Sequence, residues 1–217
     1  MPDLQQLENP VDKYASQILS SDGKLIGTWS YSKANRIFVD YADLPPYLVQ
    51  ALIATEDERF EEHSGIDFRA LVRVAVKTLL LRQKSAGGGS TITQQLVKQL
   101  YSGTAGSVRE RALQKPIEWV ISLKIERHYT KEEIITMYLN HFDFLHNAVG
   151  IKTAAKTYFG KEPKDLTLNE AATLVGMCKN PSYFNPVRKP ERCQERRNVV
   201  LGQMKRAGYL SQEEYDK

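Results

Sequence analysis

The sequence predicts a mainly α-helical domain over residues 44–217, preceded by a small N-terminal β-hairpin and linker over residues 1–43. Only one segment has a convincing strand pattern, whereas helix-start signals recur along the rest of the chain. Apolar residues make up 41% of the 217 residues, and a chain of this length buries roughly 70% of its unfolded surface. We therefore expect a folded domain that needs no disulfide or metal to hold it together.

The strand pattern covers residues 15–29 and surrounds the run Ser-Asp-Gly-Lys at residues 21–24. An Asp-Gly pair tolerates the positive φ values that a tight hairpin turn requires. Two short antiparallel strands are predicted here.

The helix signals begin at Pro45-Pro46, which opens a helix over residues 47–55, and Asp67 can cap a helix that runs through Leu81. Four capping boxes, each with Ser or Thr three residues before Glu, follow at Ser107/Glu110, Thr130/Glu133, Thr167/Glu170 and Ser211/Glu214. Five or more helices are expected. Because the last box lies close to the end of the chain, we expect the sequence to be a fragment of a longer polypeptide.

Several classes of protein are disfavoured. The longest run without Lys, Arg, Asp or Glu is residues 85–97, far short of the roughly 20 apolar residues of a membrane span, and residues 1–17 lack the pattern of a signal peptide. A net charge of +4 is modest, and no aromatic and basic reader motif suggests nucleic-acid binding. Cysteine and histidine spacings predict no zinc site; these residues are Cys178, Cys193, His63, His128, His141 and His146.

Residues 56–65 contain five carboxylates, an arginine and a histidine directly after an apolar run. A solvated surface is the ordinary explanation for charge this dense. The alternative is that Glu56, the acid nearest the apolar run, is partly desolvated and serves as a general base near neutral pH.

Residues 87–98 join three glycines to a Ser/Thr-capped helix start. Free backbone N–H groups and the helix dipole predict an anion site there, although the nucleotide P-loop pattern is absent. Gln94 and Lys98 are one turn apart and are expected on one face. A flexible linker before an ordinary capped helix is the alternative.

The helix beginning near Ser107 places Arg111, Lys115 and Glu118 on one face, and Pro116 should kink it. An exposed ladder of salt bridges is one explanation. The other is a site where the cations stabilise a departing diphosphate while Glu118 holds a metal or orients a lysine. Its predicted apolar stripe comprises Leu113, Ile117, Val120, Ile121 and Ile125.

Residues 66–81 carry a basic stripe of Arg69, Arg73 and Lys77. Apolar residues flank it, among them Phe68, Leu71, Val72, Val76, Leu79 and Leu80. Such a helix can lie on an anionic lipid surface with its apolar side among the acyl chains. A core helix with one wet face is the alternative.

In this order, the segments resemble the peptidoglycan glycosyltransferase module of class A penicillin-binding proteins and of related single-module transglycosylases. Residues 56–65 resemble the family's first motif, EDxxFxxHxG, and residues 88–95 match its second, GGSTITQQ. Residues 114–118 stand in place of RKxxE, residues 131–140 (KEEIITMYLN) resemble the fourth motif, and residues 196–201 (RRNVVL) resemble the fifth, RxxxVL. The resemblance covers nearly everything after Tyr14.

The resemblance implies a lysozyme-like helical fold and polymerisation of lipid II at the outer face of the bacterial cytoplasmic membrane. Glu56 would take the proton from the 4-hydroxyl of the acceptor sugar. Glu118 would be the second carboxylate and would assist a loosely bound divalent cation, Mg²⁺ or Mn²⁺, or the nearby cations. An N-terminal membrane anchor and a downstream transpeptidase domain would be absent from this chain.

The same resemblance implies which residues hold the donor's diphosphate and the sugars. These are Ser90, Thr91, Gln94, Gln95, Lys98 and Lys115, together with Asp57, Phe60 and His63 from the first motif. The sequence departs from the third motif because Gln114 replaces its arginine. Arg109 or Arg111 could supply the missing cation.

The residue types favour transfer over hydrolysis. A glycoside hydrolase protonates a poor leaving group and so keeps one carboxyl acidic in an apolar, cation-free pocket. A diphosphate leaving group instead needs positive charge, which surrounds Glu118 in the sequence. A lysozyme-type or lytic enzyme on the same fold is the alternative enzyme, and a non-catalytic membrane-surface adaptor is the alternative of another class.

Overall fold

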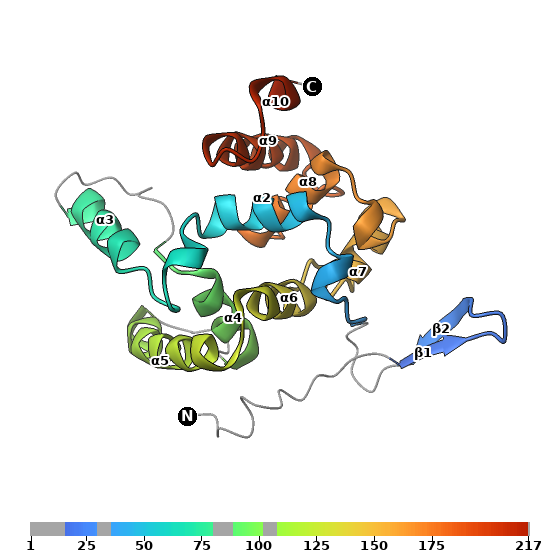
Figure 1. The fold of residues 1–217 in the computed structure, drawn as a ribbon, viewed down its shortest axis with the longest axis horizontal. Helices are drawn as coiled ribbons and strands as arrows, with labels where there is room; N and C mark the ends of the chain where they lie inside the picture. The colour runs from blue at the N-terminus through green and yellow to red at the C-terminus, as the bar shows by residue number, and fades with distance from the viewer. Residues whose placement is uncertain (1–15, 30–35, 80–88, 102–107, 217) are drawn as a thin grey trace. The chain divides into compact units, whose positions relative to one another are not determined.

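The computed structural model describes residues 16–29, 36–79, 89–101 and 108–216, most of which are helical (Figure 1). The prediction of a mainly α chain with a small N-terminal hairpin is confirmed. The chain divides into two compact units, one formed by residues 56–138 and the other by residues 3–55 with residues 139–217. These units do not test the proposed division between residues 43 and 44, which stays a prediction.

The hairpin consists of β1 (Ser16–Leu19) and β2 (Leu25–Trp29), paired antiparallel. Gly23 has a φ of +78° in the turn, and its N–H donates to the carbonyl of Ser20 at 2.9 Å. The positive φ is the conformation that the Asp-Gly pair predicted.

The first unit contains the short helix η2 (Phe60–Glu62) and the helices α3 (Phe68–Leu79), α4 (Ile92–Tyr101) and α5 (Val108–His128), with most of α6 (Lys131–His141). Asp67 caps α3 by accepting the N–H of Ala70 at 2.9 Å, as predicted. The Thr130/Glu133 capping box at the start of α6 is also present. The core of the first unit includes Phe60, Ile92, Leu96, Val97, Ile121, Ile125 and Ile134.

The second unit is built from η1 (Tyr41–Asp43), nearly all of α2 (Pro46–Glu56), α7 (Ile151–Phe159), η3 (Pro163–Asp165), α8 (Leu168–Cys178), α9 (Pro190–Arg206) and α10 (Gln212–Asp216). Helices α8 and α9 pack together at Gly176, where a Cβ would lie 3.1 Å from Cγ of Arg196. The predicted capping boxes at Thr167/Glu170 and Ser211/Glu214 both form. The box at Ser107 lies outside the described residues.

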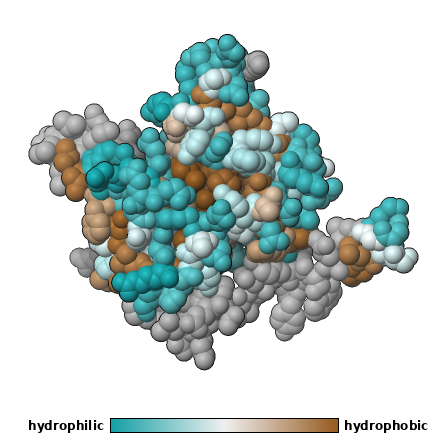
Figure 2. All heavy atoms as spheres, viewed as in Figure 1, coloured by the Kyte–Doolittle hydropathy of each residue, from teal (hydrophilic) through white to brown (hydrophobic). Residues whose placement is uncertain are grey.

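The predicted apolar stripe of α5 is wrong in its first half. Leu113 is 73% exposed, and Ile117 and Val120 are also exposed. Figure 2 likewise shows hydrophobic residues, in brown, at the surface of the molecule. The buried face instead comprises Glu118, Ile121, Ser122 and Ile125. The reason is close packing around Gly65, at which a Cβ would lie only 2.9 Å from the backbone oxygen of Ser122. This contact turns the face of Glu118 inward.

Among the described residues, no helix combines the length and the apolar character that a membrane crossing requires. Cys178 and Cys193 are both buried free thiols. Burial raises the pKa of the Cys193 thiol.

Candidate active site

Glu56 is the last residue of α2 and begins the first unit. Its Oε2 accepts a hydrogen bond from Nε2 of Gln95 on α4 at 3.0 Å. The other end of that amide, Oε1, accepts from the hydroxyl of Tyr138 on α6 at 3.1 Å. The side chain of the predicted base is therefore held by the segment that matches the second motif.

Asp57, the next residue, is directed into the unit and is 7% exposed. Its carboxylate contacts Nε2 of His63 at 3.0 Å and accepts the N–H of Ile92 at 3.0 Å. The N–H of Gly65 donates to Nδ1 of His63 at 3.2 Å, which makes Nε2 the nitrogen that carries the proton. Both side chains that the resemblance assigned to substrate are thus committed to contacts within the protein.

The carbonyl of Gly65 accepts two hydrogen bonds from the second motif. Oγ1 of Thr91 donates at 2.8 Å and Nε2 of Gln94 donates at 3.1 Å. Thr91 and Gln94 are each 2% exposed, whereas Lys98 is exposed. One turn of helix separates Gln94 from Lys98, but only Lys98 reaches solvent, because the amide of Gln94 is drawn to Gly65.

The predicted anion site at the start of α4 is wrong for two of its backbone groups. The N–H of Ile92 donates to Asp57, and the N–H of Gln94 donates to Oγ1 of Thr91 at 3.2 Å. The side chains of Asp57 and Thr91 accept these bonds and so cap the start of α4. These two N–H groups are therefore not available to an anion.

Lys115 supplies a positive charge beside the start of α4. Its Nζ lies 2.7 Å from Oε2 of Glu118 and donates to Oγ of Ser90 at 2.9 Å. The Lys115 side chain is 40% exposed, whereas that of Glu118 is 5% exposed. Because its acid is buried, this pair is not the exposed salt-bridge ladder considered above.

The two predicted catalytic carboxylates are both tied to one short segment. Gln95 bonds to Glu56, and Ser90 bonds to the lysine that pairs with Glu118. Ser90 and Gln95 are five residues apart. The segment matching the second motif thus places a carboxylate near one end and a cation near the other.

Arg109 and Arg111 are the two predicted substitutes for the arginine missing from the third motif. Arg109 and Arg111 both lie on α5, but their side chains are outside the described part of the structure. Gln114 is half-buried. The assignment of Arg109 or Arg111 stays a prediction.

Sequence reasoning missed the Thr93–Glu126–Lys131 cluster. Oε1 of Glu126 accepts from Oγ1 of Thr93 at 2.5 Å, and its Oε2 lies 2.7 Å from Nζ of Lys131. Lys131 also donates to the carbonyl of His63 at 2.6 Å and lies 4.2 Å from the centre of the Phe60 ring. Glu126 is two turns after Glu118, and this spacing could have indicated a second acid on the inward face. Phe60, assigned to substrate by the resemblance, is fully buried beneath this lysine.

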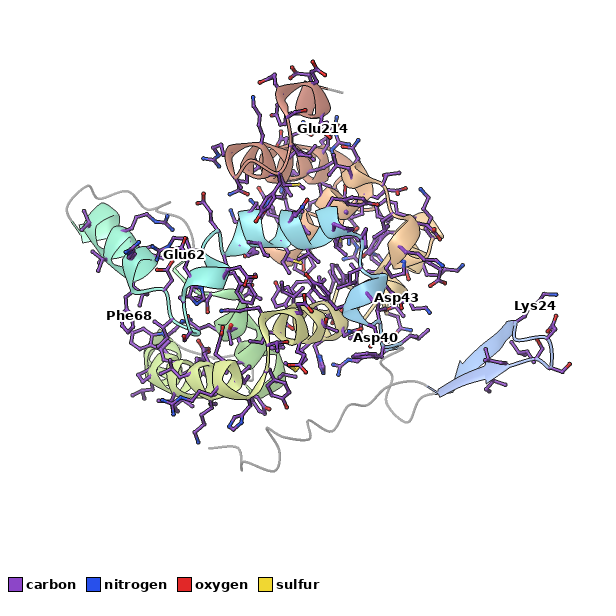
Figure 3. All side chains as sticks on the ribbon, in the orientation of Figure 1. Lys24, Asp40, Asp43, Glu62, Phe68 and Glu214 are labelled. Atoms are coloured by element: carbon purple, nitrogen blue, oxygen red, sulfur yellow. The ribbon has the colours of Figure 1, made fainter. Side chains whose placement is uncertain are left out.

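Helix α3 presents the predicted mixture of apolar and basic residues to solvent. Phe68, drawn at the first turn in Figure 3, is 69% exposed and Val72 is 62% exposed. Arg69 and Arg73 are exposed as well. The side chains of Lys77 and Leu79 are not among those described, and Leu80 lies outside the described residues.

The start of α3 is anchored by an ion pair between Arg59 and Asp67. Burial alone raises the pKa of Asp67, but the N–H of Ala70 and the guanidinium of Arg59 together bring it below its usual value. In turn, the hydrogen bond to Asp67 raises the pKa of the Arg59 guanidinium. This ion pair connects the first motif, residues 56–65, to the start of α3.

The residues fit a divalent cation only as a loosely held group. Within the described residues, no cluster of three His, Cys, Asp or Glu side chains could hold a metal ion. Glu118 could offer one carboxylate, although it is paired with Lys115. Mg²⁺ often binds through one or two carboxylates plus the phosphates of a substrate, which is compatible with this donor set.

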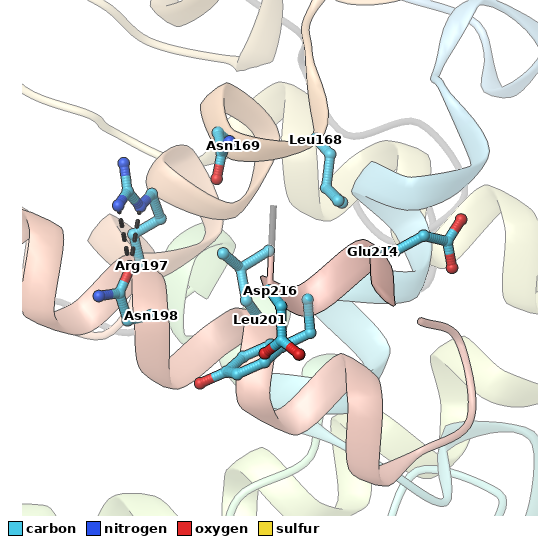
Figure 4. A pocket seen from close by; sticks show the side chains of 8 residues that line it. Leu168, Asn169, Arg197, Asn198, Leu201, Glu214 and Asp216 are labelled. Carbon is cyan, nitrogen blue, oxygen red and sulfur yellow. Dashed lines mark hydrogen bonds between the residues drawn. The ribbon is translucent and has the colours of Figure 1, made fainter. Parts of the chain in front are cut away.

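A pocket of about 580 Å³ lies in the second unit (Figure 4). Within it, Arg197 donates to Oδ1 of Asn198 at 3.0 Å. None of the predicted site residues lines this pocket. Its lining is Leu168, Asn169, Arg197, Asn198, Leu201, Glu214, Tyr215 and Asp216.

Comparison with known proteins agrees with the motif resemblance. The model of the family described as Transglycosylase matches residues 22–205. Penicillin-binding protein 1A of Aquifex aeolicus is 39% identical over 217 residues, and that of Escherichia coli is 40% identical over 217 residues. Both alignments cover 100% of this chain, but only 29% and 25% of the relatives.

Among solved structures, the crystal structure of penicillin-binding protein 1A from Haemophilus influenzae is 30% identical, with a TM-score of 0.49. That alignment covers 93% of this chain and 20% of the other. The chain therefore spans less than a third of the length of each of these relatives. From the match of the family model over most of its length and from the identity to these relatives, the chain belongs to the transglycosylase family.

Proposed function

We propose that this chain polymerises lipid II into β-1,4-linked glycan strands, as a peptidoglycan glycosyltransferase. The reaction is a single inverting displacement that releases polyprenyl diphosphate. The observation that carries the proposal is the attachment of Glu56 and of the Lys115–Glu118 pair to the same segment, residues 90–95. Family membership supports the reaction class.

On the acceptor side, Glu56 takes the proton of the sugar 4-hydroxyl as that oxygen attacks the anomeric carbon of the donor. A general base must have its carboxylate oriented and available for the proton. The hydrogen bond from Gln95 supports the ionised carboxylate and orients it, since an amide N–H is a donor to a charged acceptor.

On the donor side, the bond from the anomeric carbon to the diphosphate breaks and negative charge accumulates on the leaving group. Lys115 is the positioned cation that stabilises this charge. Glu118 and Ser90 hold its ammonium group at 2.7 Å and 2.9 Å. Lys98, exposed on α4, and one of Arg109 and Arg111 add further positive charge.

A divalent cation, Mg²⁺ or Mn²⁺, would be held by the diphosphate and by Glu118. When bound, it would neutralise part of the charge on the leaving group. The inward orientation of Asp57, His63, Thr91 and Gln94 favours a positioning role for these residues over direct contact with the substrate.

The exposed face of α3 is proposed to lie on the membrane surface, where the lipid tails of donor and acceptor enter. Phe68 and Val72 would enter the acyl boundary, while Arg69 and Arg73 would contact anionic headgroups. The site would face outward from the bacterial cytoplasmic membrane. In the full-length protein, an N-terminal anchor and a C-terminal transpeptidase domain would accompany it.

The test is incubation of the 217-residue chain with labelled lipid II and Mg²⁺ in anionic vesicles, followed by sizing of the products. Elongated glycan supports the proposal when the matched Glu56→Gln variant produces none. Shortening of preformed glycan would instead select the lysozyme-type hydrolase. Vesicle binding without turnover of lipid II would select the non-catalytic adaptor.

A further inference from the structure

We propose that Tyr138 is a positioning residue for the general base and acts on Glu56 through Gln95. This inference rests on the proposed function, because it assumes that Glu56 is the base. Three elements contribute one residue each: the end of α2, the middle of α4 and α6. All three residues belong to the first unit.

The contacts form a continuous chain of donors and acceptors. The hydroxyl of Tyr138 donates to Oε1 of Gln95 at 3.1 Å, and Nε2 of Gln95 donates to Oε2 of Glu56 at 3.0 Å. Both distances lie within the range of ordinary hydrogen bonds.

The direction of the chain follows from the chemistry of the amide. An ionised carboxylate only accepts hydrogen bonds, so it requires the NH₂ end of Gln95. If the amide rotated by half a turn, its oxygen would face the carboxylate and the two would repel each other. The Tyr138 O–H bonds to the amide oxygen and thereby stabilises the orientation that offers a donor to Glu56.

Burial separates this role from that of a substrate ligand. Tyr138 is 0% exposed, whereas Glu56 and Gln95 are partly exposed. A buried tyrosine hydroxyl normally finds a hydrogen-bond partner, and here that partner is the amide that reaches Glu56. Tyr138 can therefore influence the reaction without touching the sugar or the diphosphate.

The decisive variant is Tyr138→Phe, which removes the hydroxyl and keeps the ring that fills the core. The lost hydrogen bond joins two neutral groups, the Tyr138 hydroxyl and the Gln95 amide oxygen, so its loss lowers the population of the amide orientation that donates to Glu56 by up to about tenfold. We expect kcat to fall by about that factor with little change in KM. The acidic limb of kcat/KM against pH should move upward by about 1 pH unit, as a tenfold change in proton affinity requires.

Tyr158→Phe is the matched control. Tyr158 lies in the second unit and donates its hydroxyl to the carbonyl of Phe144 at 2.6 Å. The substitution also removes a partly buried tyrosine hydroxyl and its hydrogen bonds, so it reproduces a general loss of stability. It should leave the pH profile of the wild type unchanged.

A second measurement needs no substrate. The carboxyl carbons of ¹³C-labelled glutamates are titrated by NMR, and the Glu56 resonance is identified by its loss in Glu56→Gln. The Glu56 titration midpoint should move upward by about 1 pH unit in Tyr138→Phe and should not move in Tyr158→Phe. Gln95→Leu should produce at least the same shift, and the double variant should add nothing to it.

The outcomes separate the inference from the proposed function. An unchanged Glu56 titration in Tyr138→Phe overturns the inference, even if the wild type polymerises lipid II. If the Glu56 titration shifts in Tyr138→Phe but the wild type makes no glycan from lipid II, the inference about Tyr138, Gln95 and Glu56 is supported and the proposed function is overturned. If Tyr138→Phe fails to fold, Gln95→Leu decides, because the chain of hydrogen bonds requires the titration to move in that variant.

Discussion

The ammonium nitrogen of Lys115 lies 2.7 Å from Oε2 of Glu118, a carboxylate that is almost completely buried. The lysine itself is 40% exposed. The pair therefore has a fixed acid inside the unit and a cation that remains accessible to an anionic ligand. This asymmetry suits a site where the lysine meets a diphosphate and the glutamate holds the lysine in place.

Lys115→Ala should reduce the rate of glycan formation by about 10²-fold or more, because removal of one preorganised charge costs a few kcal/mol in such sites. Lys115→Arg should retain part of the rate, since it keeps the charge but alters the geometry. Initial rates with labelled lipid II measure both effects, and Lys124→Ala on the same helix serves as control. Wild-type rate and diphosphate affinity in Lys115→Ala would show that the third motif has been assigned wrongly.

Glu56→Gln should abolish glycan formation while leaving the fold intact. The substitution keeps the size of the side chain, but an amide cannot take the acceptor's proton. Circular dichroism and the urea midpoint check the fold, and sizing of labelled product checks the activity. A general base contributes about 10²-fold or more to the rate. A variant that retained more than about a few per cent of the wild-type rate would therefore exclude Glu56 as the base.

The sequence predicted best those features that depend on neighbours in the chain. The capping boxes at Thr130, Thr167 and Ser211 and the turn at Gly23 each involve residues within a few positions of one another. Their hydrogen bonds form in nearly any tertiary context, so local chemistry decides them. The segments of the site were likewise recognisable because each motif is continuous.

The sequence could not predict which side of a helix the tertiary packing would bury. On α5, the spacing of Leu113 and Ile117 indicated a core stripe, but the close approach of Gly65 to Ser122 selected another face. In the same way, the inward orientation of Gln94 depends on the carbonyl of Gly65, 29 residues away. Contacts of this kind depend on packing between elements, and the periodicity of residues within one helix does not predict them.

Lys131→Ala should destabilise the chain by about 3 kcal/mol, because it leaves the Glu126 carboxylate, with a 4% exposed side chain, without its cation. Glu126→Gln should cost less, since the amide can still accept from Thr93. Urea unfolding at neutral pH measures these changes, and the double variant gives the coupling between the two residues. Purely additive effects would show that the two side chains do not act as a pair.

Asp67 should make the stability of the chain depend on pH in the acidic range. Its folded-state pKa is lowered from the usual value, so its contribution is present above the unfolded pKa of about 3.9 and is lost as the pH falls through the folded pKa. Asp67→Ala should therefore cost about 1 to 2 kcal/mol at pH 7, through the lost cap of α3 and its ion pair. The difference from the wild type should shrink below pH 4, whereas the exposed Asp43→Ala control should follow the wild type. A difference that stays constant from pH 7 to pH 2 would contradict this account.

Neutralising the exposed arginines of α3 should weaken binding to anionic vesicles. Each basic residue near such a surface contributes about 1 kcal/mol, so Arg69→Gln and Arg73→Gln should each reduce partitioning about fivefold. Phe68→Ser should also reduce it, because the 69% exposed ring would leave the acyl boundary.

Co-sedimentation at low and high salt measures binding, with Lys164→Gln, an exposed lysine of the second unit, as control. The arginine effects should diminish in high salt while the Phe68 effect persists, because salt screens the charges but not the apolar contact. Equal losses in the Lys164 control would mean that net charge, rather than the face of α3, governs binding.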